Sequence, residues 1–282
     1  MKIAILSDLH IDFYFDQKLK IIDEDAVASL YDQIFLSNGT REPATVLIIA
    51  GDIGHYNHQN IQLLKILQKL YYKHIICVLG NHDYFLLDES IQKEYDYNSF
   101  NKANELKKLI NSEPNLYCLD GDVIEIEGIR FGGAMSWYTQ AYIKEYFLDT
   151  SIKAINNDWQ QYNADSKYIF SEKITNFDDM YNIELPKIKA VYDSCDIMIT
   201  HINPSFKHEH IDSSYLNDKN NTFFTSNMHR YLANGSMKYW VFGHTHDTIE
   251  YEYEGVKCIC NPMGYPSESY YGDWIWIKSI EI

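Results

Sequence analysis

Asp, His and Asn residues recur in five short clusters, and each cluster follows a run of apolar, mostly β-branched residues. The clusters are Ser7-Asp8-Leu9-His10, Gly51-Asp52-Ile53-Gly54-His55, Gly80-Asn81-His82-Asp83, His201, and Gly243-His244-Thr245-His246. Carboxylates, imidazoles and one amide form a mixed oxygen and nitrogen donor set that contains no thiolate. Such donors suit Mn, Fe, Zn or Co better than Ca, Mg or Cu(I), so the clusters predict a metal centre.

Each cluster alone has a plainer explanation. A Gly-Asp pair is typical of a turn at the end of a strand, and a lone His201 is more often a satisfied core histidine. The joint occurrence of all five clusters, each at the end of an apolar run, favours the metal centre over these separate explanations.

The apolar runs that precede the clusters have the length and β-branched composition of buried strands. We predict strands at Ile3–Leu6, Val46–Ala50, Ile75–Leu79, Ile129–Ala134, Ile197–Thr200, Tyr239–Phe242 and Lys257–Cys260. Apolar spacing predicts helices at 63–70 and 99–110, so the N-terminal half reads as layered α/β. From Ile129 onward we expect strands to dominate and helices to become sparse. Ligands in open α/β sheets bind at the carboxyl ends of strands, where the clusters fall.

The chain has no visible repeat or linker, so we predict one domain over residues 1–282. Two polar stretches, 137–193 and 202–236, fit the strand pattern poorly and are predicted to be cap or loop insertions. The second separates two of the clusters and is favoured to face the site. Plain surface elaboration explains the first equally well. Alternating aromatic residues at 270–276 favour a packing role.

Composition limits the partners. A formal charge of −16 with only three Arg residues opposes broad binding to nucleic acid or to anionic membranes. Five scattered Cys residues read as small buried hydrophobic side chains in a reduced compartment. The sequence shows neither a signal peptide nor a run of 18 apolar residues, so we expect a cytoplasmic protein without membrane contact.

The five blocks, in this order from residue 8 to residue 246, resemble those of the calcineurin-like metallophosphoesterase superfamily. The resemblance implies a four-layer α/β/β/α sandwich with the metal site at the carboxyl ends of the strands. It also implies two divalent or trivalent ions per chain, for which Mn is favoured and Fe, Zn or Co are alternatives. By motif, the first ion would be held by Asp8, His10, Asp52 and His246. The second would be held by Asp52, Asn81, His201 and His244, with the Asp52 carboxylate bridging.

For the reaction, the resemblance implies hydrolysis of a phosphodiester or phosphomonoester by a hydroxide that bridges the two ions. His82 resembles the non-ligand histidine of the superfamily, which protonates the leaving oxygen. Asp83 would accept from the other ring nitrogen of His82 and fix its tautomer.

Branches of the superfamily that act on different substrates differ from this chain at specific positions. Protein Ser/Thr phosphatases carry Asp-Arg where this chain has His55-Tyr56, and purple acid phosphatases have Asp-x-Gly in place of Asp8-x-His10. A histidine at position 55 resembles the double-strand-break repair nucleases, so a DNA or RNA nuclease is the alternative enzyme. A non-catalytic metal-binding scaffold is the alternative outside enzymes. The roles of His55 and of three further candidates for the pocket, His208, His210 and Arg230, stay open.

Overall fold

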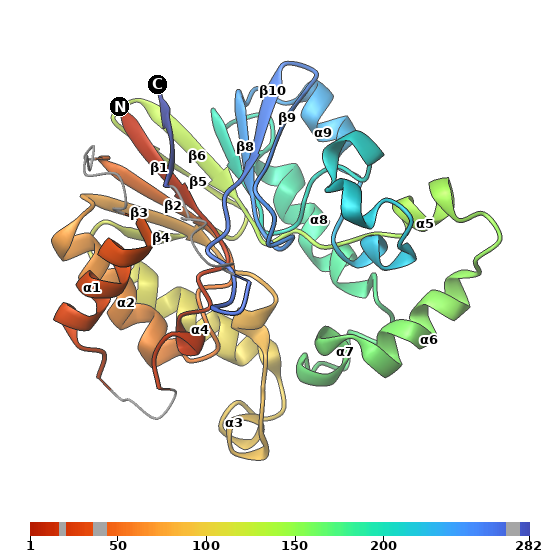
Figure 1. Ribbon diagram of the computed structural model, residues 1–282, viewed down its shortest axis with the longest axis horizontal. Coiled ribbons are helices and arrows are strands. Elements are labelled where there is room, and N and C mark those ends of the chain that lie inside the picture. The colour runs from red at the N-terminus through yellow and green to blue at the C-terminus, as the bar shows by residue number, and fades with distance from the viewer. Residues whose placement is uncertain (17–20, 36–43, 269–276) are drawn as a thin grey trace.

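Two β-sheets packed face to face organise the chain, which a computed structural model describes over residues 1–16, 21–35, 44–268 and 277–282 (Figure 1). Within these residues the sheets have five strands in the order β11-β1-β2-β3-β4 and six in the order β5-β6-β7-β8-β10-β9. The first sheet comprises β1 (Lys2–Leu6), β2 (Val46–Ala50), β3 (His74–Val78), β4 (Leu116–Cys118) and β11 (Lys278–Glu281). The second comprises β5 (Asp122–Ile126), β6 (Ile129–Gly133), β7 (Ile197–Ile199), β8 (Tyr239–Phe242), β9 (Ile249–Tyr253) and β10 (Val256–Cys260).

All strands that carry the clusters run parallel within their sheet. Strands β1, β2, β3 and β4 are parallel, and β11 pairs antiparallel to β1. In the second sheet β6, β7, β8 and β10 are parallel, with β5 and β9 as antiparallel edges. The seven predicted strands are confirmed, with no end displaced by more than one residue. Four described strands were not predicted, and two of them, β5 and β9, are partly exposed, which dilutes their apolar signal.

Alternate side chains of the central strands point to opposite faces and divide the core into layers. Ile5 of β1 and Val241 of β8 pack between the two sheets. Leu6 of β1 turns to the outer face of the first sheet, and Trp240 of β8 turns to the outer face of the second.

Helices cover both outer faces. They are α1 (Glu24–Phe35), α2 (Asn57–Leu70) and α4 (Ser99–Asn111) on the first sheet, and α8 (Asp179–Val191) and α9 (His229–Asn234) on the second. Leu63 of α2 and Leu106 of α4 join the core on the first sheet, and Ile188 of α8 and Leu232 of α9 join that on the second. The predicted α/β/β/α sandwich is therefore confirmed, and the helices predicted at 63–70 and 99–110 correspond to parts of α2 and α4.

The expectation that helices become sparse after Ile129 is wrong. The stretch 137–193 contains α5 (Ala141–Tyr146), α6 (Ile152–Tyr162), α7 (Ala164–Tyr168) and all of α8. In α6 only a narrow stripe is apolar, with Ile155 and Trp159 buried between Asn, Asp and Gln residues. Because Asn and Asp favour helices weakly, the stripe is easily read as a loop. In Figure 1, α5, α6 and α7 extend away from the sheets as a helical insertion.

The second polar stretch, 202–236, is a series of short 3₁₀ turns that ends in α9. The turns are η3 (His208–His210), η4 (Ser213–Tyr215) and η5 (Lys219–Phe223). The predicted aromatic packing segment at 270–276 lies outside the described residues.

All five cysteines are buried, as predicted for small hydrophobic side chains. Among the described residues, no helix has both the length and the apolar character needed to cross a membrane.

Candidate metal centre

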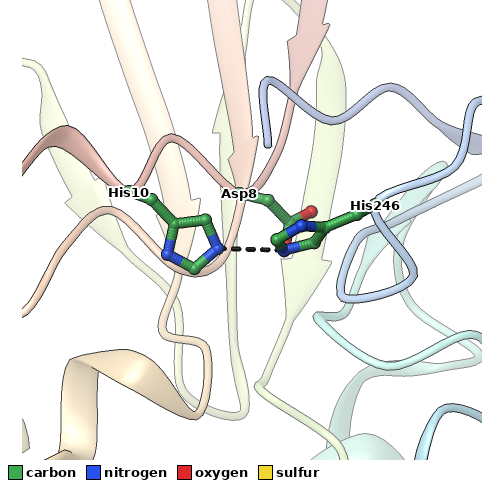
Figure 2. A group of neighbouring side chains, drawn as sticks. All are labelled: Asp8, His10 and His246. Atoms are coloured by element: carbon green, nitrogen blue, oxygen red, sulfur yellow. Dashed lines mark hydrogen bonds and ion pairs between the residues drawn. The ribbon is translucent and has the colours of Figure 1, made fainter. Parts of the chain in front are cut away.

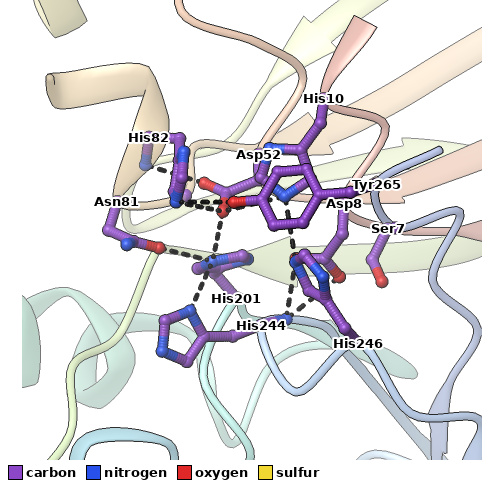
Figure 3. A network of polar contacts seen from close by, with 12 residues as sticks. Ser7, Asp8, His10, Asp52, Asn81, His82, His201, His244, His246 and Tyr265 are labelled. Carbon is purple, nitrogen blue, oxygen red and sulfur yellow. Dashed lines mark hydrogen bonds and ion pairs between the residues drawn. The ribbon is translucent and has the colours of Figure 1, made fainter. Parts of the chain in front are cut away.

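All seven predicted ligands lie together at one edge, beyond the carboxyl ends of five parallel strands (Figure 3). The ligands that follow these strands are Asp8 and His10 after β1, Asp52 after β2, Asn81 after β3, His201 after β7, and His244 and His246 after β8. The two sheets are joined at this edge, because the amide of His244 donates to both carboxylate oxygens of Asp8 at 3.0 Å. The fold thus brings residues from both ends of the chain into one site.

The backbone at this edge is held in an uncommon conformation. Five ligands have positive φ angles: Asp8 (52°), His10 (41°), Asp52 (53°), His244 (72°) and His246 (54°). Non-glycine residues adopt this region rarely, and such strain gathers at functional sites. Gly51 has a φ of 88°, and a Cβ there would lie 2.4 Å from Nδ1 of His201. The glycine therefore lets β2 and His201 approach closely enough to share a site.

One group of ligands surrounds a point beside β1 (Figure 2). Nε2 of His246 lies 3.0 Å from Nε2 of His10 and 3.6 Å from Oδ1 of Asp8. Nε2 of His10 also lies 3.7 Å from Oδ2 of Asp52. These four side chains are the ones predicted for the first ion. The ligand atoms of Asp8, His10 and His246 all lie within 4.8 Å of one another, which is close enough for one metal ion to contact all three.

A second group adjoins the first through the same carboxylate. Nε2 of His201 lies 3.3 Å from Oδ2 of Asp52, 2.9 Å from Oδ1 of Asn81 and 3.2 Å from Nδ1 of His244. The other oxygen of Asp52 accepts from the amide of His82 at 2.9 Å. Oδ2 of Asp52 therefore faces both groups, as expected of a bridging carboxylate.

Three of the ligand imidazoles are oriented by a hydrogen bond on their outer nitrogen. The bonds run from Nδ1 of His201 to O of Ala50 (2.9 Å), from Nε2 of His244 to O of Phe223 (3.0 Å) and from Nδ1 of His246 to Oε2 of Glu268 (2.7 Å). Each oxygen accepts, so each inner nitrogen carries a lone pair in the neutral ring. Partners of this kind are the usual supports of metal-binding histidines.

The inner nitrogens provide a test of whether these residues fit a metal. Nε2 of His201 and Nδ1 of His244 face each other at 3.2 Å, and both rings have committed their other nitrogen to a carbonyl. The lone pairs on these two nitrogens repel each other unless a cation or a proton lies between them. The donor set thus fits a transition-metal centre of mixed nitrogen and oxygen ligands.

The charges at the centre favour a bound cation. Burial lowers the pKa of His201, but the Asp52 carboxylate outweighs burial and raises it to about 9. Burial opposes ionisation of Asp52, but the surrounding histidines, His201 first, hold its pKa well below the usual range. In the metal-free protein a proton on His201 takes the place that a cation would otherwise fill.

His82 lies beside the ligands. Its Nε2 is 4.0 Å from Oδ2 of Asp52 and 3.4 Å from Oη of Tyr265. Burial lowers the pKa of His82 to about 3. The ligand atoms of three residues, His10, Asp52 and His82, also lie within 4.8 Å of one another. His82 could therefore contact a metal ion as well as a substrate.

A chain of hydrogen bonds extends from the far side of His82. Its Nδ1 lies 2.8 Å from Nε2 of His55, and Nδ1 of His55 lies 2.7 Å from Oδ2 of Asp12. His55 and Asp12 are 5% and 3% exposed, so the chain is shielded from water. Sequence reasoning left His55 open and missed Asp12. The one available signal is the position of Asp12 two residues after His10.

The predicted contact between Asp83 and His82 is wrong. Oδ2 of Asp83 accepts from the amide of Gly80 at 2.8 Å, and Asn60 donates to Oδ1 at 3.4 Å. His82 and Asp83 are neighbours in a 3₁₀ turn (His82–Tyr84), which points successive side chains in different directions. Burial and the nearby Asp52 raise the pKa of Asp83 to about 7. Asp83 therefore braces the turn, and His55 takes the orienting position.

A cavity of about 1110 Å³ opens over the centre. Its walls come from α6 and α7 of the helical insertion, from the turns of segment 202–236 and from the loop after β8. Segment 202–236 thus faces the site as predicted, and so does the insertion. Among the charged side chains of the described lining, carboxylates outnumber lysine and arginine: Asp52, Asp158, Asp165, Asp212, Asp218, Asp247 and Glu268. The described lining has one lysine, Lys219, whose Nζ lies 2.6 Å from Oδ2 of Asp158.

Three candidates from the sequence are outside the described lining of this cavity. His208 stacks on Tyr146 with ring centroids 3.6 Å apart, and Nδ1 of His210 lies 2.7 Å from Oγ of Ser205. Arg230 is exposed on α9. Packing and hydrogen bonding elsewhere therefore account for His208 and His210, and Arg230 lies on the surface.

Known proteins resemble this chain in sequence and in fold. A family model described as calcineurin-like phosphoesterase matches residues 1–248. An uncharacterized protein of Acanthamoeba polyphaga mimivirus is 27% identical over 281 residues, which is 93% of this chain and 91% of that protein. The crystal structure of a phosphopantetheinyl hydrolase from Mycobacterium tuberculosis superposes with a TM-score of 0.65 at 17% identity, covering 99% of this chain and 95% of that one.

The family model spans every predicted ligand from Asp8 to His246, and the solved structure shares the fold. The chain belongs to the calcineurin-like phosphoesterase family.

Proposed function

We propose that this protein is a two-metal phosphoesterase that hydrolyses a small phosphodiester or phosphomonoester. The observation that carries the proposal is the shared position of Asp52, whose Oδ2 lies 3.7 Å from Nε2 of His10 in one ligand group and 3.3 Å from Nε2 of His201 in the other. Asp8, His10, Asp52 and His246 would hold one ion, and Asp52, Asn81, His201 and His244 the other. Mn is the first metal to test, with Fe, Zn and Co after it.

When bound, the ions would supply positive charge for the phosphoryl oxygens and acidify the attacking water. The residues of the chain do the rest. Asp12 accepts from Nδ1 of His55, which leaves a lone pair on Nε2 of His55 to accept from Nδ1 of His82. His82 is thereby left with Nε2 facing the centre as the atom that can exchange a proton.

The direction of that proton transfer depends on the substrate. Burial keeps His82 neutral in the free protein, with a pKa of about 3. A bound phosphate brings negative charge next to the ring and favours its protonated form. Nε2 of His82 would then donate to the oxygen of the leaving group as general acid.

The cavity argues for a small substrate. Its described lining holds seven carboxylates, and its lysine is already paired with Asp158. A polyanion such as DNA or RNA would be repelled there, and the formal charge of −16 adds to that repulsion. His55 is the residue that resembles the repair nucleases, but its contacts with His82 and Asp12 would serve the hydrolysis of any phosphoester and do not single out a nuclease.

The first experiment compares initial rates on an aryl phosphodiester and the matching monoester in Mn²⁺, with a chelator control. The relative from Mycobacterium tuberculosis is named a phosphopantetheinyl hydrolase, so a phosphopantetheinyl ester belongs in the same panel. We expect Mn²⁺-dependent turnover of at least one ester, abolished by chelation. A protein that binds two ions but hydrolyses no ester in the panel would overturn the proposal and favour the metal-binding scaffold.

A further inference from the structure

The amide of Asn81 is held on two sides. Its Nδ2 donates to Oδ1 of Asp165 at 2.7 Å, and its Oδ1 lies 2.9 Å from Nε2 of His201 in the second ligand group. An amide can rotate so that oxygen and nitrogen exchange places, and only the oxygen can bind a metal ion. What lies opposite the amide therefore decides whether Asn81 can serve as a ligand.

Asp165 decides the orientation because an ionised carboxylate can only accept. If the amide were reversed, Oδ1 of Asn81 would face the carboxylate of Asp165, acceptor against acceptor, and its NH₂ would face the centre. The bond that Asn81 makes now has a charged acceptor, which is the stronger kind. Asp165 is only 3% exposed, so water does not weaken it by competition.

Asp165 is itself anchored by the helical insertion. It lies in α7, and its Oδ2 accepts from Oη of Tyr138 at 2.8 Å. Oη of Tyr138 in turn accepts from Nε1 of Trp159 in α6 at 2.7 Å. Tyr138 and Trp159 are 0% and 4% exposed. A buried path of hydrogen bonds thus runs from the insertion to a predicted metal ligand.

We propose that Asp165 is a positioning residue for the second metal ion, and that the insertion bearing α6 and α7 is part of the metal centre as well as a wall of the cavity. The inference rests on the proposed two-metal function. It assigns Asp165 no contact with the ion or the substrate. Its effect passes through the amide of Asn81 alone.

The test measures metal binding without substrate. Metal-free protein is titrated with Mn²⁺ by calorimetry, and electron paramagnetic resonance distinguishes paired from single Mn²⁺. For Asp165→Ala we expect the second ion to bind about 10- to 100-fold more weakly, as is usual when the support of a ligand is removed. The first ion should bind as in the wild type, and the signal of paired Mn²⁺ should be lost at concentrations that fill both wild-type sites.

Asp165→Asn keeps the size of the side chain but lets its own amide present a donor to Asn81. We expect a weaker second ion in this variant too, by a smaller factor than in Asp165→Ala. Ser166→Ala is the matched control, because Oγ of Ser166 bonds to backbone oxygens of the same insertion, those of Gln160 and Asn163. The control should bind both ions as the wild type does.

Wild-type affinity for the second ion in a folded Asp165→Ala protein would overturn the inference while leaving the proposed function intact. If that variant does not fold, the same result in folded Asp165→Asn would overturn it. Equal loss in Ser166→Ala would also overturn it, because the cause would then be the folding of α7. A wild-type protein that binds only one ion would overturn both the inference and the two-metal function.

Discussion

Nδ1 of His82 and Nε2 of His55 lie 2.8 Å apart, so two imidazoles from the ends of neighbouring strands form one hydrogen-bonded pair. His55 stands five residues after the end of β2, and His82 stands four residues after the end of β3. Parallel pairing of these strands brings the two rings together. Asp12 completes the chain on the far side of His55 at 2.7 Å.

Removing His55, or changing which of its ring nitrogens carries the proton, should slow the reaction. In Asp12→Asn the new amide can donate to Nδ1 of His55, which favours the tautomer that cannot accept from His82. We expect kcat to fall about tenfold or more in Asp12→Asn and in His55→Ala, with KM little changed, because a misoriented proton donor acts on the chemical step. Steady-state kinetics with the best ester test this. His58→Ala, an exposed change on α2, is the control. Unchanged kcat in both variants would show that the chain does not orient His82.

His82→Ala should separate catalysis from metal binding. If His82 is the general acid, the variant keeps both ions and loses turnover by about 10²- to 10⁴-fold. Metal analysis of the purified variant and kcat on the aryl ester are measured together. His82, His10 and Asp52 also meet the distance requirement for a metal group. Loss of an ion in His82→Ala would therefore make His82 a ligand and refute the role proposed here.

Asp52→Asn should weaken both metal sites at once. Oδ2 of Asp52 faces both ligand groups, and its Oδ1 is already committed to the amide of His82. The amide substitution removes the negative charge from the shared position, so we expect fewer than two ions per chain and no turnover. Elemental analysis after dialysis gives the stoichiometry. Two retained ions would exclude Asp52 as the bridge.

The strands and their terminal clusters are predictable from the sequence because both signals are local. An apolar run and the polar residues that follow it lie within ten residues, and the parallel sheet then gathers the strand ends at one edge. The contacts that orient the ligands are distant in sequence. Asp165 meets Asn81 across 84 residues and His55 meets Asp12 across 43, and neither pair has a pattern of its own. The role predicted for Asp83 is wrong because it relied on Asp83 being next to His82 in the sequence. In a 3₁₀ turn, neighbouring residues point their side chains in different directions.

Metal uptake at the second site should release a proton. The Asp52 carboxylate raises the pKa of His201 to about 9 against the effect of burial, so the metal-free ring is protonated at neutral pH. An ion must displace that proton, and its apparent affinity should rise about tenfold per pH unit until about pH 9 and then level off. Calorimetry in buffers of different ionisation enthalpy gives the number of protons released. An affinity that does not change between about pH 6 and about pH 8, a range that lies wholly below the plateau, would contradict this assignment.

The negative charge of the cavity determines how salt should change KM for anionic substrates. Seven carboxylates line its described walls, and Nζ of Lys219 is 2.6 Å from Asp158. Repulsion between like charges weakens when salt screens it, so KM for a multiply charged ester such as a short oligonucleotide should fall as salt rises from about 50 to about 300 mM. A nuclease with a basic groove shows the opposite trend, because salt competes with binding to the phosphates. The matched control is an aryl phosphodiester with a single charge, whose KM should change less. Mn²⁺-dependent cutting of DNA that declines steeply with salt would therefore favour the nuclease and contradict the small-substrate proposal.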